Sequence, residues 1–459
     1  MTFSIGSIGI VDKINDEHGL IDLLFGSGFG RAKNIVPIAK LLIANRLDKA
    51  ASVHRLPELY PEQFFQELGF KETPKERNIY RGVERIGERF NPLVENYQLF
   101  VKNKNLISKE QFTDFSSAYF EGTKSELGAL GYSRDGQPGK KQITFGISTG
   151  INNVPSALTI QKGNVQDKTH MRTMFNACKK IMPKGTMFIF DCGGNTNANK
   201  KLFTEAGFEY LTLKPKKRTV YKKYIKRFNS EKKQTITFNE VEYACIKLKE
   251  ENETQYLFYS EKLKKEQIQK RKKKFKRLLE KNQPLVSKAL KGKELANHPT
   301  SEGYVVATGS LQKTLAKIKN PFITGLEGFF ILESSVDAEI EKILKLYKER
   351  DKAEKLIRNI KEGTELRPMR HWTKNAILGY ILIVFLTNCI TALTQLLIKN
   401  PLVKNTKLLK KYLTNLTLTI VYPKKAFQIR LLSNISPETE QIFGKSIHKY
   451  GVTSVDLRW

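Results

Sequence analysis

Four side chains between positions 347 and 361 have types and a spacing that could act on a phosphate group. On an ideal α-helix of about 100° per residue they would share an arc of about 60°, and they are Tyr347, Arg350, Glu354 and Lys361. The carboxylate could bind a metal ion, while the two cations and the phenol could contact phosphate oxygens. A simpler interpretation is a surface helix with an ordinary i,i+4 ion pair between Arg350 and Glu354, and composition alone favours it.

Two aspartates farther upstream could complete a metal site with Glu354. Asp114 lies in the β-prone run 111–120, and Asp191 ends the apolar run 185–191. A buried strand that ends in aspartate can place a carboxylate at the carboxyl edge of a sheet, although a core strand with a turn aspartate is the simpler interpretation. Three acids on separate elements suit two Mg²⁺ ions roughly 3.5 to 4 Å apart, with Mn²⁺ as a substitute, and such a pair supports phosphodiester cleavage. The candidate catalytic and metal-binding residues are therefore Asp114, Asp191 and Glu354.

The elements that would position the two aspartates form a recognisable series. Three β-prone runs are followed by a helix, a buried strand and a further helix–strand unit; they cover 111–120, 142–147, 154–160, 167–181, 185–191 and 199–213. The order βββαβαβ is that of a ribonuclease H-like domain. The predicted fold class is therefore α/β, with a ribonuclease H-like mixed sheet and helices, interrupted by a basic β-rich insertion and preceded by a mostly helical N-terminal domain.

The charge of the chain indicates a polyanionic partner. Lys and Arg outnumber Asp and Glu by 79 to 46, which gives a net charge of +33. Nucleic acid is the simplest partner for such a chain, although a ribosomal or membrane-surface protein could be equally basic. Between positions 214 and 277 there are 22 Lys or Arg against 8 Asp or Glu, so this stretch is a candidate DNA-facing segment.

These patterns divide the chain into five segments. Residues 1–105 form a helical N-terminal domain with predicted DNA binding, in which Arg81, Arg85 and Arg89 either contact phosphates or form a solvated face. The first part of the catalytic domain covers 106–215, and a basic β-rich insertion covers 216–320. The second part of the catalytic domain, with the Glu354 helix, covers 321–400, and a C-terminal region covers 401–459.

The four cysteines and six histidines favour neither a zinc site nor a disulfide framework, because the cysteines lack CxxC pairs and the histidines are scattered. This usage fits a reducing cytoplasm, and no secretory signal is evident at the N-terminus. The run 376–398 has 23 residues without a charge and could span a bilayer. Its threonines, Asn388 and Gln395 favour instead a buried core helix, and we predict no membrane partner.

Several motifs around the three acids resemble those of insertion-sequence transposases of the DDE type that carry the signature Tyr-x2-Arg-x3-Glu-x6-Lys. The resemblance covers about 110–400. Its motifs are Asp114 to Glu121, Gly131 to Gly136, Lys141-Gln142, Gly163-Asn164 with Asp167, Phe190 to Gly193, the signature helix, Leu366-Arg367-Pro368 and His371.

The resemblance implies a Mg²⁺-dependent transposase that cuts the ends of its own element and joins them to target DNA. Asp114, Asp191 and Glu354 would form the metal-binding triad, and Tyr347, Arg350 and Lys361 would contact the element-end DNA. The implied partners are inverted-repeat DNA and target DNA, bound by a homodimer associated with the nucleoid of a prokaryotic cytoplasm. A ribonuclease H-like metal-dependent nuclease and an inactive, DNA-binding descendant of a transposase are the alternatives.

Overall fold

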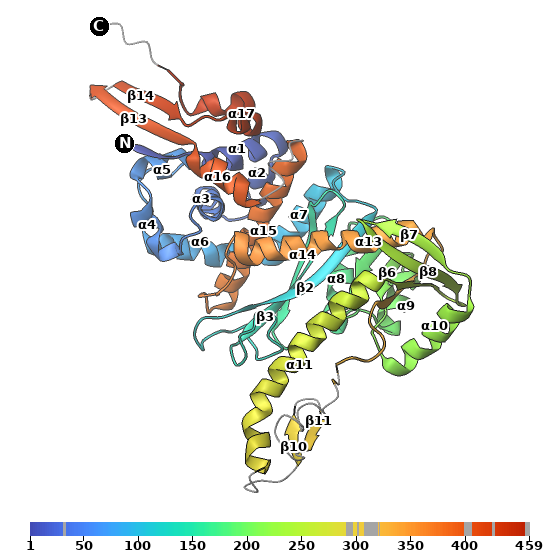
Figure 1. The fold of residues 1–459 in the computed structure, drawn as a ribbon. Coiled ribbons are helices and arrows are strands. Elements are labelled where there is room, and N and C mark those ends of the chain that lie inside the picture. The colour runs from blue at the N-terminus through green and yellow to red at the C-terminus, as the bar shows by residue number, and fades with distance from the viewer. Residues whose placement is uncertain are drawn as a thin grey trace. The chain divides into compact units, whose positions relative to one another are not determined.

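A computed structural model of the chain divides into two compact units (Figure 1). The first unit contains Met1–Phe208 and Lys348–Trp459, and the second contains Glu209–Tyr347. The structure describes residues 1–30, 34–290, 297–300, 303–306, 320, 322–398, 406–424 and 427–454. Parts of the predicted insertion and of the predicted C-terminal region therefore lie outside the described residues.

The first unit is built on a sheet with the strand order β4-β3-β2-β5 (Figure 1). Three strands form an antiparallel meander, and the fourth runs parallel to β2. The elements are β2 (Glu110–Tyr119), β3 (Gln142–Gly150), β4 (Pro155–Lys162), α8 (Asp167–Cys178), β5 (Met187–Phe190) and α9 (Asn197–Glu205). With β6 (Glu209–Leu213) next in the chain, the predicted order βββαβαβ and the ribonuclease H-like fold are confirmed.

The N-terminal part is mostly helical, as predicted, and its first strand pairs with the C-terminal part of the chain. The helices are α1 (Gly6–His18), α2 (Leu20–Phe25), α3 (Ile35–Leu47), α4 (Leu56–Leu59), α5 (Glu62–Glu67), α6 (Glu76–Glu88) and α7 (Phe90–Asn103). Strand β1 (Thr2–Ser4) pairs with β13 (Thr417–Lys424), which pairs with β14 (Phe427–Ser433). Helices α16 (Thr406–Asn415) and α17 (Pro437–Phe443) complete the C-terminal part.

Helix α15 (Lys374–Leu397) is the central core helix of the first unit. It is long and apolar enough to cross a membrane, but 94% of its most apolar window is buried inside the protein, which confirms the predicted buried helix. Its polar groups find partners, since Asn388 donates to Thr364 Oγ1 at 3.0 Å. Glycines allow α15 to contact α6 closely: a Cβ at Gly379 would lie 2.0 Å from the carbonyl oxygen of Val83.

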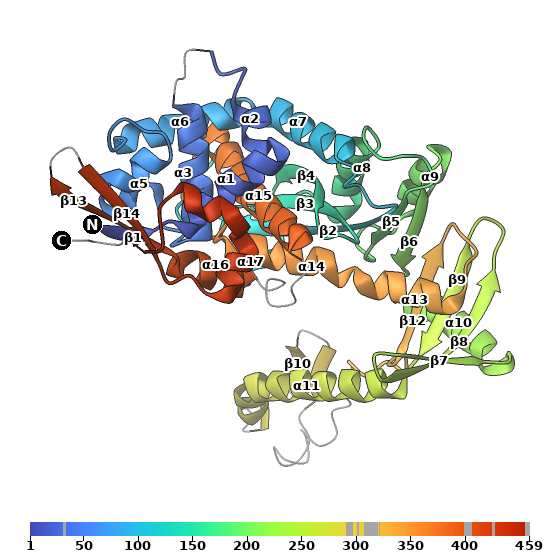
Figure 2. The ribbon, with the colours of Figure 1, turned by 90° about the horizontal axis from the view of Figure 1, so that it is seen from above.

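The second unit is an antiparallel sheet with the strand order β6-β12-β9-β8-β7, shown from above in Figure 2. Its later strands are β7 (Gln234–Phe238), β8 (Val241–Lys249), β9 (Thr254–Tyr259) and β12 (Phe329–Ser334). Tyr221 and Phe228 of α10 (Arg218–Ser230) pack on apolar residues of this sheet, including Leu257. The insertion is therefore β-rich, as predicted, and it also contains α10, the long helix α11 (Glu261–Leu290) and the short hairpin of β10 (Asn297–Thr300) and β11 (Gly303–Val306).

The segment from Tyr347 to Lys361 is not the single continuous helix that its periodicity suggested. Helix α13 (Ile340–Glu349) ends before Arg350, α14 (Asp351–Arg358) follows, and a π turn covers Asn359–Gly363. The amide of Thr364 donates to the carbonyl of Asn359 at 2.8 Å, which is the wide i→i+5 spacing of a π turn. This turn widens the residue spacing around Lys361 relative to an ideal α-helix.

Candidate active site

The first unit holds all three predicted acids. Asp114 lies in the middle of β2, opposite Ile147 of β3, and Asp191 directly follows β5. Because β2 and β5 are adjacent parallel strands, the sheet itself brings the two aspartates toward one another. Glu354 lies on α14, which packs against β2 and β3.

The electrostatics of Asp114 show that the three acids share one neighbourhood. The pKa of Asp114 is raised to about 7, chiefly by burial; Arg350 opposes the rise, and the negative charges of Asp191 and Glu354 add to it. Excess negative charge in a buried site is what a bound divalent cation would neutralise.

Arg350 lies between two of these acids. One nitrogen of its guanidinium is 3.7 Å from Asp114 Oδ1, and another forms an ion pair with Glu354. Within the described part of the chain, no three His, Cys, Asp or Glu side chains surround a common position suited to a metal ion. The arginine therefore neutralises Asp114 and Glu354 in this arrangement, and the i,i+4 ion pair of the simpler interpretation is present as well.

A fourth carboxylate, Asp167, lies beside the second aspartate. A Cβ at Gly193 would lie 2.8 Å from Asp167 Oδ2 and 3.1 Å from Asp191 Oδ1, so both carboxylates face the same glycine. The amide of Gly193 donates to Asp191 Oδ1 at 2.9 Å, and Arg134 forms an ion pair with Asp167. Sequence reasoning noted Asp167 and Arg134 only as parts of motifs and did not recognise that they meet near the acids.

Lys361 lies in a buried ion cluster. Its ammonium group pairs with the fully buried carboxylate of Asp135, which also accepts an ion pair from Arg367, and it donates to Ser116 Oγ at 3.0 Å. Burial lowers the pKa of Lys361, with Arg367 and Arg134 acting in the same direction and Asp135 against them. Ser116 and Asp114 are two residues apart and lie on the same face of β2, so Lys361 approaches the strand that carries Asp114. Sequence reasoning noted Asp135, the ion-pair partner of Lys361, only as part of the motif Gly131 to Gly136.

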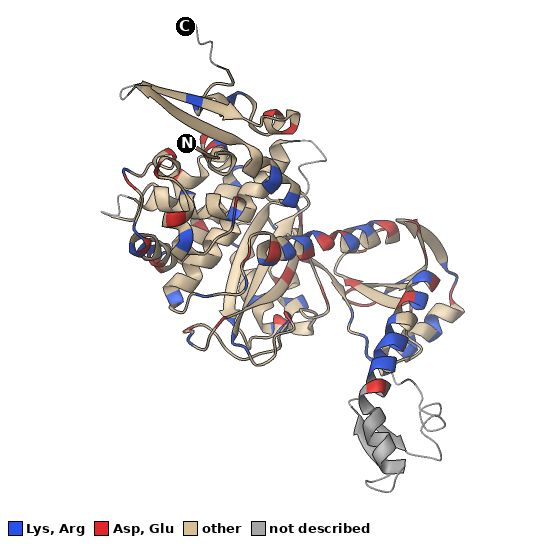
Figure 3. Cartoon of the chain, turned by 60° about the vertical axis from the view of Figure 1, so that its left-hand side comes forward, with Lys and Arg blue, Asp and Glu red and all other residues tan. Residues whose placement is uncertain are grey.

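Tyr347, the remaining residue of the signature, lies on α13 at the end of the second unit and is half-buried. The described part of α11 in the same unit is rich in Lys and Arg (Figure 3). Arg271, within the candidate DNA-facing segment 214–277, is held by an ion pair with the buried Glu327, whereas Lys272 to Lys274 are exposed.

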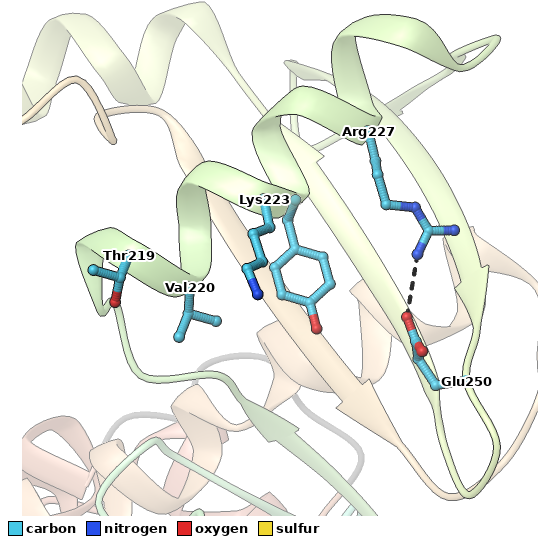
Figure 4. Close-up of a pocket in the computed structure, with 6 residues that line it drawn as sticks. Thr219, Val220, Lys223, Arg227 and Glu250 are labelled. Atoms are coloured by element: carbon cyan, nitrogen blue, oxygen red, sulfur yellow. Dashed lines mark hydrogen bonds and ion pairs between the residues drawn. The ribbon is translucent and has the colours of Figure 1, made fainter.

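A pocket of about 440 Å³ lies on the second unit between α10 and the end of β8 (Figure 4). Lys223 and Arg227 of α10 line it, and Arg227 pairs with Glu250 at 3.3 Å. Its lining contains one carboxylate and two cations, so its donor set does not suit a site for two metal ions.

Comparison with known families decides the class of the protein. Residues 121–390, more than half of the chain, match the family described as the transposase DDE domain. The chain belongs to this family. The matched span contains Asp191 and Glu354 and begins just after Asp114, at the end of β2. The predicted class of protein, a DDE transposase, is therefore confirmed.

The transposase is similar to the cryo-EM structure of a piggyBac transposase synaptic complex with hairpin DNA, with a TM-score of 0.43 and 10% sequence identity. The similarity covers 89% of this chain and 79% of that one. No curated protein gives a significant match.

Proposed function

We propose that this transposase serves an insertion element, cutting DNA at the ends of the element and joining those ends to target DNA. The observation that carries the proposal is the shared neighbourhood of Asp114, Asp191 and Glu354, which come from a central strand, the end of its parallel neighbour and a later helix. Carboxylates on separate rigid elements can hold metal ions and leave space for a phosphate.

The carboxylate groups of the three acids are suitable ligands for divalent metal ions. All three side chains offer the oxygen ligands that Mg²⁺ prefers, with Mn²⁺ as a substitute. The three acids supply three carboxylates, whereas Arg350 supplies one positive charge beside Asp114 and Glu354. When bound, two Mg²⁺ ions would activate the attacking oxygen and stabilise the leaving oxygen. We therefore assign Asp114, Asp191 and Glu354 as catalytic metal ligands.

The cations of the signature would position the DNA. Arg350 already faces Asp114 and Glu354, so release from these carboxylates would free its guanidinium for a phosphate. Tyr347 would contact the element end from α13, and Lys361 would act from the Asp135 cluster.

The same proposal includes the partners of the protein, its oligomeric state and its location. Its partners are inverted-repeat DNA at the element ends and target DNA, bound by a homodimer in the nucleoid of a prokaryotic cytoplasm. The helical segment 1–105 and the basic insertion 216–320 would add DNA contacts, since both expose cations such as Arg81, Arg85 and Lys272.

The test is Mg²⁺-dependent nicking and strand transfer on a DNA fragment that carries the element's own end. Three variants, Asp114→Asn, Asp191→Asn and Glu354→Gln, should lose cleavage and joining while DNA binding persists or tightens, because each removes a negative charge as well as a ligand. Asp351→Asn is the matched control, since Asp351 lies on the same helix as Glu354 but pairs with Lys355 on an exposed face.

The products also distinguish the alternatives. Cleavage without joined products would indicate a nuclease, and DNA binding without cleavage in the wild type would indicate an inactive descendant. Substantial cleavage by the Glu354→Gln variant under conditions where the wild type is active would reject the assigned triad.

A further inference from the structure

A strongly basic pocket of about 520 Å³ lies within the first unit, apart from the three acids. Its walls come from the end of α3 and the loop after it, from α6, and from the segment that joins the π turn to α15. Five cations line it against one carboxylate, Glu365: they are Arg46, Lys49, Arg55, Arg367 and Arg370. His371 adds no charge near neutral pH, because burial and Arg46 lower its pKa to about 4.

Two of the cations have fixed structural partners. Arg46 donates to the carbonyl oxygens of Ala50 and Ala51, at 3.2 and 3.4 Å, and its guanidinium lies over the ring of Tyr380. Arg367 pairs with Asp135 and Glu362. These two arginines hold the walls of the pocket in place.

The other cations face solvent. Lys49, Arg55 and Arg370 are exposed, and across the described ranges no carboxylate lies within ion-pair distance of any of them. Lys49 lies 5.3 Å from the centre of the Tyr60 ring. Cations gathered around one cavity without acidic partners repel each other, and an anion in the cavity would relieve that repulsion.

The pocket is joined to the candidate active site through the sheet and through the ion cluster. Met369, in the pocket wall segment, pairs with Phe120 beside the end of β2 and accepts a hydrogen bond from the amide of Glu121 at 2.8 Å. Arg367 contacts Asp135, which contacts Lys361, and Lys361 donates to Ser116, two residues from Asp114. Asp114 and the pocket wall are therefore about 20 Å apart along the strand, at about 3.3 Å per residue.

We propose that this pocket binds a backbone phosphate of the DNA that the acids process. The proposal rests on the proposed function and adds a site to it. Because phosphates on one strand of a duplex advance along the helix axis and also wind around it, a span of about 20 Å places the bound phosphate a few nucleotides from the one at the acids. Arg55 and Arg370 supply the charged contacts, and Arg46 and Arg367 position the loops that present them.

The first test measures the affinity of the full-length protein for the element-end duplex as a function of salt concentration. The variant Arg55→Gln/Arg370→Gln should reduce the slope of log K against log salt by about 2 and weaken binding roughly eightfold per lost contact at 0.1 M salt. Lys179→Gln/Lys184→Gln is the matched control, because it removes two exposed cations between α8 and β5, neither of which lines the pocket. Glu365→Gln removes the one carboxylate of the pocket and should tighten binding.

The second test locates the phosphate. Single methylphosphonate substitutions, which neutralise one phosphate at a time, should weaken wild-type binding at a position a few nucleotides from the cleavage position. At that position the same substitution should not weaken binding by the variant Arg55→Gln/Arg370→Gln, which has already lost the contact. Circular dichroism spectra and thermal midpoints that match those of the wild type would show that the variants are folded.

The outcomes separate this site from the proposed function. If the wild type cuts element ends but the pocket variant keeps the salt slope of the control, the pocket is not a DNA site and the function stands. If inorganic phosphate binds the wild type but not the variant, and does not displace DNA from the wild type at constant ionic strength, the pocket is a site for small anions and the proposal fails. A wild type that neither binds nor cuts the element end would reject both.

Discussion

Replacement of Asp135 tests whether the buried ion cluster holds Lys361 in place. The Asp135 carboxylate is fully buried, and the side chain of Lys361 is 9% exposed. Asp135→Asn keeps the shape of the side chain and removes its charge, which leaves the ammonium group of Lys361 with neutral acceptors, namely the new amide oxygen and Ser116 Oγ. Arg367 is more exposed and keeps its ion pair with Glu362, so it contributes little to the cost.

The loss of unfolding free energy expected for Asp135→Asn follows from the cost of burying a lysine charge without its counter-ion. Removing one partner of a buried pair costs about 3 to 5 kcal/mol. Lys361 can limit this cost by losing its proton, which for an ordinary lysine of pKa about 10.4 requires about 4 kcal/mol at pH 7.5 and about 1 kcal/mol at pH 9.5. The variant should therefore lose about 3 to 4 kcal/mol of unfolding free energy at pH 7.5, and much less at pH 9.5.

The sign of this pH dependence is fixed by linkage. Loss of Asp135 lowers the pKa of Lys361 further below that of the unfolded chain, so the unfolded state binds more protons at alkaline pH and stability rises with pH. The assay is urea unfolding followed by circular dichroism at both pH values, for Asp135→Asn, Lys361→Met and the double variant. The double variant should cost less than the sum of the single variants by about 1 to 3 kcal/mol. Additive effects, or a loss below about 1 kcal/mol for Asp135→Asn at pH 7.5, would refute the cluster.

Three further predictions concern the candidate site and its surroundings. Because the pKa of Asp114 is raised to about 7, its ionisation costs stability as pH rises through 7. Asp114→Asn should therefore raise the unfolding free energy at pH 8, by at most about 4 kcal/mol. Urea titrations should show this gain shrinking toward pH 4. Burial lowers the pKa of His170, whose ring is hydrogen-bonded to Thr159, to about 3. Below pH 6.5 the unfolded chain therefore binds one more proton than the folded chain, and stability should fall as pH drops from 6.5 toward 3. His170→Gln should flatten that fall. Arg350→Gln removes the cation beside Asp114 and Glu354. Mn²⁺ should then bind several-fold more tightly, measured by electron paramagnetic resonance, while DNA cleavage declines. An unchanged Mn²⁺ affinity would contradict competition between Arg350 and metal.

The sequence predicted the elements around the acids because their patterns are local. Helix α8 begins at Asp167, as predicted, and the strands that carry Asp114 and precede Asp191 lie where β-prone and apolar runs placed them. Periodicity could not predict the break at Arg350 or the π turn at Asn359–Gly363, since each depends on contacts made by the folded chain.

The partners of the site residues were harder to predict for the same physical reason. Lys361 and Ser116 are separated by 245 residues in the sequence, and nothing in the local pattern of either indicates that they meet. Asp135 lies in a turn-rich stretch where an aspartate usually favours the turn itself. Its burial with Lys361 and Arg367 depends on how the loop after β2 closes over the segment beyond the π turn.

The arrangement of charges separates two roles for the cations of this transposase. Arg350, Lys361 and Arg367 are already paired with carboxylates in the first unit, so exchanging those partners for a DNA phosphate gains little free energy from the release of counterions. Arg55 and Arg370 are exposed and have no such partner in the described ranges, and exposed cations of this kind produce the salt dependence of DNA binding. The signature cations should therefore affect where the DNA lies at the acids, while the pocket cations affect how tightly it is bound. Lys361→Met should accordingly lower the cleavage rate and leave the salt slope nearly unchanged.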